Sequence, residues 1–146
     1  MGYRSDVIQA FQFNNKDDLV AFVTMVKLTG NDTMKEVLNQ YKFTRYAYLE
    51  DYTYAYVMYF EQDGIKWYDS NDDVQAHHTL LKQALNHKAA MIFIRAGEDL
   101  GDTDLDEGGY DNCEGRIKSY ILDELFNIRQ EVYISEDVTD TPLDQL

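Results

Sequence analysis

The sequence has little cysteine, few basic residues and no long apolar run, and each shortage excludes a class of protein. Its single cysteine, Cys113, excludes an intramolecular disulfide framework and a zinc site made of several cysteines. No apolar run approaches the roughly 20 residues of a membrane-spanning helix, and the N-terminus lacks the apolar core of a signal peptide. We therefore expect a cytoplasmic protein without membrane association. Only 13 Lys and Arg face 27 Asp and Glu, which disfavours direct binding to nucleic-acid phosphates.

What the sequence does contain is enough apolar material for a folded core. Of its 146 residues, 45% are hydrophobic and 14% aromatic, which indicates a folded domain of ordinary size. Residues 1–96 carry 12 acidic and 10 basic residues, whereas residues 97–146 carry 15 and 3, so the net charge of −14 lies almost wholly in the last third. We expect a single domain over residues 1–134 and an acidic C-terminal tail over residues 135–146.

Apolar periodicity, capping residues and turn residues predict the order of the elements. We expect strands at Val7–Phe13, within Tyr41–Tyr68, at Ala89–Arg95 and at Ile128–Ile134, and helices from Asn14 or Asn15 to Gly30, at Thr33–Gln40, from a cap at Asp69–Asn71 to Leu85 and at Arg116–Phe126. Thr33 and Glu36 match a capping box. In the tyrosine-rich stretch, Glu50-Asp51 is typical of a hairpin turn, and Asp63-Gly64 of a turn or bulge before a strand that ends at Tyr68.

This order favours an α+β fold with a mainly antiparallel sheet and helices on one face. We expect a ferredoxin-like core with a C-terminal α-β addition. The segment Gly97–Gly115 has eight acidic residues and no basic one, and we expect it to form an acidic loop. Its acidic residues are Glu98, Asp99, Asp102, Asp104, Asp106, Glu107, Asp111 and Glu114.

A calcium site is one interpretation of the acidic segment. Asp102, Asp104 and Asp106 match positions 1, 3 and 5 of an EF-hand loop, which supplies the oxygen ligands that calcium prefers. The later positions do not fit, because Glu107 replaces the glycine of position 6 and Cys113 replaces the glutamate of position 12. A solvated acidic loop is the better interpretation. We expect no metal and no cofactor, with calcium as the alternative.

Residues that often carry catalysis lack suitable neighbours here. His77 and His78 are adjacent on a predicted helix and match no metal-binding motif, so we expect one to pack and the other to be solvated. Cys113 lies among acidic residues, which disfavour its thiolate form. The sequence contains no glycine-rich phosphate loop. We therefore expect no catalytic residues and no enzymatic activity.

Two further segments carry a recognisable pattern. The opening Met1–Val7 reads MGYRSDV, and Gly64–Val74 reads GIKWYDSNDDV. Together they resemble a largely uncharacterised group of small proteins of tailed bacteriophages, whose members open GYRS and carry a K-W-Y-x-S-x-x-D-V stretch. The resemblance implies a phage origin and a place in the host cytoplasm, and it assigns no functional residues.

The acidic residues themselves suggest a function. Carboxylates at alternate positions of an extended chain lie about 6.5–7 Å apart, a spacing comparable to that of successive phosphates along a nucleic-acid strand. By analogy with other small acidic phage proteins, the hypothesis is a DNA mimic that binds and inhibits a host protein with a basic nucleic-acid-binding surface. The predicted contacts are Glu98, Asp99, Asp102, Asp104, Asp106, Glu107, Asp111 and Glu114. A virion or assembly protein, or a homodimer built on the tyrosine-rich sheet, is a further alternative.

Overall fold

The computed structural model describes residues 2–48, 53–109, 111, 126–128 and 132–134 of the chain. A five-stranded antiparallel sheet has the strand order β2–β3–β1–β4–β5, and a separate two-stranded sheet pairs β6 with β7. The strands are β1 (Ser5–Phe13), β2 (Lys42–Tyr48), β3 (Thr53–Ile65), β4 (Ala90–Gly97), β5 (Thr103–Gly108), β6 (Phe126–Ile128) and β7 (Val132–Ile134). The helices are α1 (Lys16–Thr29), α2 (Asp32–Leu38) and α3 (Asp72–Asn86).

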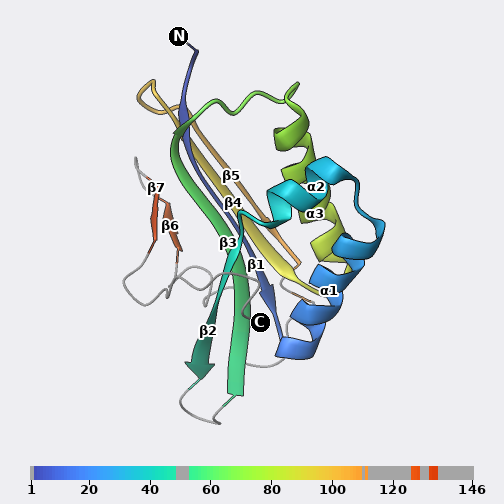
Figure 1. The fold of residues 1–146 in the computed structure, drawn as a ribbon. Helices are drawn as coiled ribbons and strands as arrows, with labels where there is room; N and C mark the ends of the chain where they lie inside the picture. The colour runs from blue at the N-terminus through green and yellow to red at the C-terminus, as the bar shows by residue number, and fades with distance from the viewer. Residues whose placement is uncertain (1, 49–52, 110, 112–125, 129–131, 135–146) are drawn as a thin grey trace.

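The three helices lie together on one face of the large sheet, as expected, and the β6–β7 pair lies on the other side, where β7 contacts β1 and β4 (Figure 1). The α+β class and the mainly antiparallel sheet are confirmed. None of the helices in the described part of the chain is long and apolar enough to cross a membrane.

Local capping sets the ends of the first two helices. Asn15 caps α1 as expected, because its side chain accepts a hydrogen bond from the backbone N–H of Asp18 at 2.8 Å. The cap of α2 differs from the prediction. Asn31, not Thr33, accepts from the backbone N–H of Met34 at 2.8 Å, so the cap lies two residues earlier, and the helix spans Asp32–Leu38 instead of Thr33–Gln40. Asparagine is at least as good an N-cap as threonine, and it displaces the predicted capping box.

The expected irregularity at Asp63-Gly64 is a bulge within β3. Gly64 has a φ of +64°, and the pairing of β1 with β3 shifts between Ser5 and Val7. Beyond the bulge β3 ends at Ile65, so the predicted continuation of the strand to Tyr68 is wrong. The chain instead leaves the sheet, and Trp67 packs above it. The predicted turn at Glu50-Asp51 lies outside the described residues.

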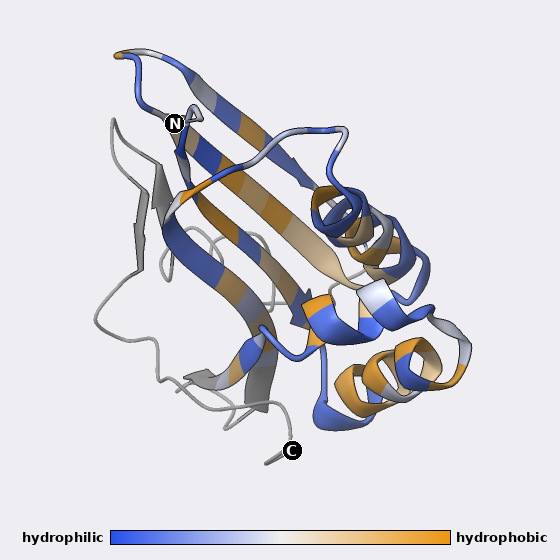
Figure 2. Cartoon of the chain, turned by 45° about the horizontal axis from the view of Figure 1, so that its top comes forward, coloured by the Kyte–Doolittle hydropathy of each residue, from blue (hydrophilic) through white to orange (hydrophobic). Residues whose placement is uncertain are grey.

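The core lies between the helices and the sheet, where apolar faces meet (Figure 2). Phe11 and Phe13 of β1 contact Phe22 of α1, with ring centroids 6.1 and 5.6 Å apart. Burying a side chain of this size stabilises the fold by roughly 1.5–3 kcal/mol. The opposite face of β1 and β4 is also buried, at Ile8 and Ile94 among others. The predicted central strand at Ala89–Arg95 is confirmed as β4, which lies between β1 and β5.

The C-terminal third departs most from the predictions. The expected acidic loop contains a strand, β5, which pairs with β4 to form a hairpin. The expected single strand Ile128–Ile134 is wrong, because β6 and β7 are two short strands that pair with each other. An alternating apolar pattern fits one long strand and an antiparallel pair of short strands equally well. The predicted helix at Arg116–Phe126 lies outside the described residues except for Phe126, which begins β6. The predicted tail at residues 135–146 lies wholly outside them.

Candidate binding site

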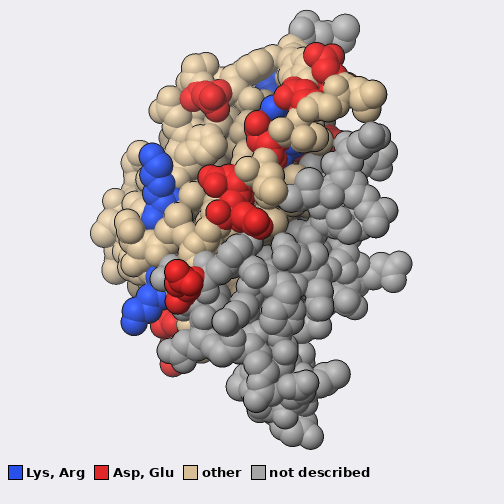
Figure 3. Space-filling view, turned by 180° about the vertical axis from the view of Figure 1, so that it is seen from behind, with Lys and Arg blue, Asp and Glu red and all other residues tan. Residues whose placement is uncertain are grey.

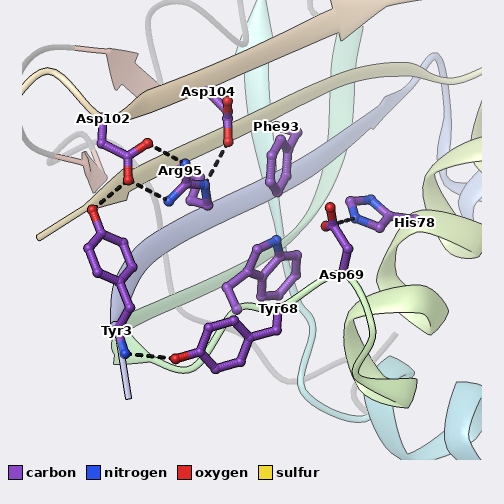
Figure 4. A pocket seen from close by; sticks show the side chains of 9 residues that line it. Tyr3, Tyr68, Asp69, His78, Phe93, Arg95, Asp102 and Asp104 are labelled. Carbon is purple, nitrogen blue, oxygen red and sulfur yellow. Dashed lines mark hydrogen bonds and ion pairs between the residues drawn. The ribbon is translucent and has the colours of Figure 1, made fainter. Parts of the chain in front are cut away.

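A pocket opens on the helix side of the sheet, at the end where the β4–β5 hairpin turns. Its volume is about 400 Å³, within the range of roughly 300–1,000 Å³ that small ligands occupy. The N-terminal segment, the chain between β3 and α3, α3 itself and both hairpin strands contribute to it (Figure 4). The lining residues are Tyr3, Trp67, Tyr68, Asp69, His78, Phe93, Arg95, Asp102 and Asp104.

Arg95 organises one side of the pocket. Its guanidinium donates to Asp102 through Nη2 at 2.7 Å and to Asp104 through Nε at 2.6 Å. Nη1 donates to the hydroxyl of Ser5 at 3.0 Å. The hydrogen bonds with Asp102 raise the pKa of Arg95 further above its usual range. Arg95 is thus a permanent cation that joins β1 to both arms of the hairpin. Ser5, Arg95, Asp102 and Asp104, with Tyr3, are called the Arg95 cluster below.

Tyr3 attaches the N-terminal segment to this cluster. Its hydroxyl donates to Oδ2 of Asp102 at 2.5 Å and accepts from the backbone N–H of Asp99 at 3.0 Å. The hydrogen bond to Asp102 raises the pKa of Tyr3. The pKa of Asp102 is lowered, first by Arg95 and then by Tyr3, so Asp102 stays ionised at neutral pH.

The two segments with a recognisable sequence pattern meet beside this pocket. The backbone N–H of Tyr3 donates to the hydroxyl of Tyr68 at 2.7 Å, and the guanidinium of Arg4 donates to the carbonyl of Gly64 at 2.8 Å. The backbone N–H of Gly64 in turn donates to Asp6 at 2.8 Å. These contacts join positions about 60 residues apart in the sequence, and they explain why both segments contribute to one site.

Aromatic rings form the other wall. Trp67 stacks on Phe93 with ring centroids 5.8 Å apart. His78 meets both rings edge-on at 6.0 Å. The Nε2 of His78 lies 3.7 Å from a carboxylate oxygen of Asp69, whose side chain is 94% exposed. The apolar wall is therefore edged by one carboxylate on the α3 side and by the Arg95 cluster on the hairpin side (Figure 4).

Carboxylates outnumber cationic groups in the lining of the pocket. The lining has three carboxylates, those of Asp69, Asp102 and Asp104, and one guanidinium, that of Arg95, which binds Asp102 and Asp104. The tyrosine hydroxyl nearest the carboxylates is already held by hydrogen bonds. The pocket therefore carries excess negative charge beside aromatic faces.

The structure separates the predicted contact residues into three sets. Asp102 and Asp104 bind Arg95, although the side chain of Asp104 is still 58% exposed, and the exposed Glu98 accepts from the backbone N–H of Arg4 at 3.0 Å. The others that the structure describes are exposed along or beyond the hairpin; these are Asp99, Asp106, Glu107 and Asp111. Glu114 lies outside the described residues. Viewed from behind the orientation of Figure 1, the described part of the surface shows prominent acidic side chains (Figure 3).

The geometry does not assemble a calcium site from the acidic string. Asp104 and Asp106 lie on β5 opposite Arg95 and Phe93, so their carboxylates are spaced along a strand instead of converging. Two of the three aspartates already bind a guanidinium. Over the described ranges, no group of three or more His, Cys, Asp or Glu is placed to hold a metal ion.

A second polar cluster lies deeper on the same side of the sheet. The side-chain N–H groups of Gln9 donate to the hydroxyl of Tyr41 at 2.7 Å and to the backbone carbonyl of His77 at 2.9 Å. The Tyr41 hydroxyl lies 2.8 Å from Nδ1 of His77. All three side chains are at most 2% exposed, and we call them the sealed cluster. Of the two histidines, His77 packs, as expected of one of them, whereas His78 is 39% exposed and lines the pocket.

Sequence reasoning missed most of the pocket. The resemblance to phage proteins contained the signal for Tyr3, Trp67, Tyr68 and Asp69, which fall inside the two quoted segments. Nothing in the sequence pattern singles out Arg95 as the partner of the acidic residues. Searches of family models, curated proteins and solved structures gave no match to the chain.

Proposed function

We propose that this chain is a non-enzymatic acidic protein that binds, through the β4–β5 hairpin, a host protein with a basic nucleic-acid-binding surface and inhibits it. The observation that carries the proposal is the ordering of the acidic segment. Asp104 and Asp106 stand at alternate positions of a strand whose backbone pairs with β4, so their spacing of about 6.5–7 Å is fixed. A fixed row of charges attracts a cationic groove without first losing conformational entropy.

Arg95 changes which acidic residues can act as contacts in the DNA mimic that the sequence suggests. It neutralises part of the charge of Asp102 and Asp104, which are therefore weaker outward contacts than predicted. It also fixes both side chains, and one guanidinium leaves the pair with excess negative charge. The exposed Asp99 and Asp106 lie on either side of this centre along the hairpin. The proposed contact surface is thus the hairpin turn and β5, organised around Arg95.

The proposal also includes a location in the host cytoplasm and a ferredoxin-like core. The resemblance to tailed-phage proteins supports a host cytoplasmic target. Support for a ferredoxin-like core comes from the strand order β4–β1–β3–β2, with helices between β1 and β2 and between β3 and β4. In that description β5 is an added edge strand, and it is this added strand that bears the acidic row.

The test is competition between the chain and DNA for purified host nucleic-acid-binding proteins. The chain should displace duplex DNA, and its affinity should fall steeply as salt rises from about 0.05 to 0.2 M. The double variant Asp99→Asn/Asp106→Asn should weaken binding and reduce the salt dependence. The matched control Asp17→Asn/Glu36→Gln removes the same charge from exposed positions on α1 and α2. Affinity that ignores salt, or that falls equally in both double variants, would count against the hairpin.

A further inference from the structure

We propose that the pocket beside the hairpin binds an arginine side chain of the basic partner protein. This inference rests on the proposed function, because that partner supplies the side chain. The pocket adjoins the hairpin surface, since Asp102 and Asp104 belong to both. A protein that binds the hairpin therefore brings its own side chains to the mouth of the pocket.

The aromatic wall fits a cation. Cations bind over the faces of tryptophan, tyrosine and phenylalanine, within about 6 Å of the ring centre. Trp67 and Phe93 stack in the wall, and Tyr3 and Tyr68 stand at its open edge (Figure 4). The Tyr68 hydroxyl accepts from the backbone N–H of Tyr3, and the Tyr3 hydroxyl donates to Asp102, so both rings are held in place before a ligand arrives.

The carboxylates exclude an anion and complete the cation site. The guanidinium of Arg95 already donates to Ser5, Asp102 and Asp104, and so it has little capacity to bind an incoming anion. The side chains of Asp69 and Asp104 are 94% and 58% exposed. They lie on opposite sides of the aromatic wall, where each can accept a hydrogen bond from a bound cation.

Arginine suits this arrangement better than lysine. The guanidinium group is planar, so it stacks on aromatic faces while its edge donates to carboxylates. The ammonium group of lysine is compact and strongly hydrated, and it does not stack. A volume of about 400 Å³ accommodates the head and stem of one long side chain. Arg95 itself shows the mode of recognition, because its guanidinium edge faces two aspartates.

Trp67 provides a specific reporter, because it is the only tryptophan of the chain and lines the pocket. Its emission is followed while hexa-arginine or hexa-lysine peptide is added at constant ionic strength. We expect a saturable change with hexa-arginine, at an affinity about two- to fivefold tighter than that of hexa-lysine. Asp69→Asn should lower the affinity for the arginine peptide about two- to fivefold. The control Asp17→Asn should leave the titration unchanged.

The outcomes separate this inference from the proposed function. If basic host proteins bind with the expected salt dependence but Trp67 emission does not respond and Asp69→Asn has no effect, the arginine assignment is overturned and the hairpin proposal stands. Equal affinity for the two peptides also overturns the assignment. If hexa-arginine binds as expected but no basic protein competes with DNA, the proposed function fails, and with it the assignment of the side chain to such a partner.

Discussion

Two polar clusters on the same side of one sheet differ in their access to water. The sealed cluster of Gln9, Tyr41 and His77 lies under the helices, whereas the Arg95 cluster lies beside the turn of the β4–β5 hairpin and lines the open pocket. Both take residues from β1 or its N-terminal approach, and α3 supplies a histidine to the sealed cluster and another to the pocket. The scaffold is shared, so burial decides which polar group packs inside the fold and which lines an open pocket.

The adjacent histidines show the difference within one turn of helix. Burial, with a smaller contribution from His78, lowers the pKa of His77 to about 3. In the sealed cluster the neutral imidazole packs against the rings of Tyr41 and Phe60, with centroids 5.5 and 4.3 Å away. His78 turns to the pocket, where the carboxylate of Asp69 is within ion-pair distance. Adjacent side chains point about 100° apart on a helix, so α3 serves both regions.

The largest predicted effect is an acid sensitivity that comes from the sealed cluster. The unfolded chain protonates His77 below a pKa of 6.5, but the folded chain does so only near 3. The stability due to neutral His77 is therefore fully present above pH 6.5 and is lost progressively as the pH falls toward 3. Between pH 6.5 and 4.5 the free energy of unfolding should fall by about 2–3 kcal/mol. Urea denaturation at several pH values measures this change.

His77→Gln is the control for this prediction. It removes the titrating group but keeps a polar side chain beside Tyr41. Its stability at neutral pH should be lower, and its pH dependence between 6.5 and 4.5 should be flatter than that of the wild type. The lowered pKa of Asp102 acts at lower pH, because that carboxyl loses its contribution only below its unfolded pKa of 3.8. Parallel pH profiles of wild type and variant would show that His77 is not the sensor.

The next largest effect is expected from a substitution that removes hydrogen bonds from the sealed cluster. Gln9→Leu removes the donors to Tyr41 and to the carbonyl of His77 and leaves buried acceptors without them. We expect a loss of about 2 kcal/mol in the free energy of unfolding, measured by urea denaturation. Gln40→Leu, at an exposed position, should change it by less than about 0.5 kcal/mol. Similar losses in the two variants would mean that burial does not distinguish the clusters.

Disrupting the Arg95 cluster should lower stability less than disrupting the sealed cluster. Arg95→Met leaves Asp102 and Asp104 facing each other without their shared cation. We expect a loss of about 1–2 kcal/mol, because partly exposed ion pairs contribute less than buried ones. The hairpin should lose order, which amide exchange of β5 would detect. Lys27→Met, an exposed substitution on α1, is the matched control. Unchanged exchange in β5 would show that Arg95 does not organise the hairpin.

The same contrast explains how much could be predicted from the sequence. The sealed side follows from patterns that the sequence carries: the apolar spacing of α1, the apolar run of β4 and the packing of one histidine. These patterns have a period, so the buried face is visible before folding. The glycine that bends β3 was also expected, because Asp-Gly is a local signal.

The pocket could not be predicted in the same way, because it depends on pairings across the chain. A run of acidic residues predicts a solvated loop when each residue is considered alone. Only the alignment of Asp104 with Arg95 on adjacent strands shows why an acidic strand forms there. Tyr3 reaches Asp102 across 99 positions, a distance over which no local pattern acts. The role of His78 depends likewise on where Trp67 and Phe93 meet.

The smallest predicted effect sharpens the comparison at Tyr3. Tyr3→Phe removes the hydroxyl that donates to Asp102 but keeps the ring at the mouth of the pocket. The pKa of Asp102 should rise, because one of the two hydrogen bonds that lower it is lost, while Arg95 still keeps it below the usual value. Carboxyl NMR titration measures the pKa of Asp102. The control is Tyr68→Phe, because the Tyr68 hydroxyl is bonded to the backbone of Tyr3 and not to Asp102. Because the site is open to solvent, the thermal midpoint should hardly move. A large loss of stability would instead place Tyr3 with the sealed cluster and remove the distinction between the two regions.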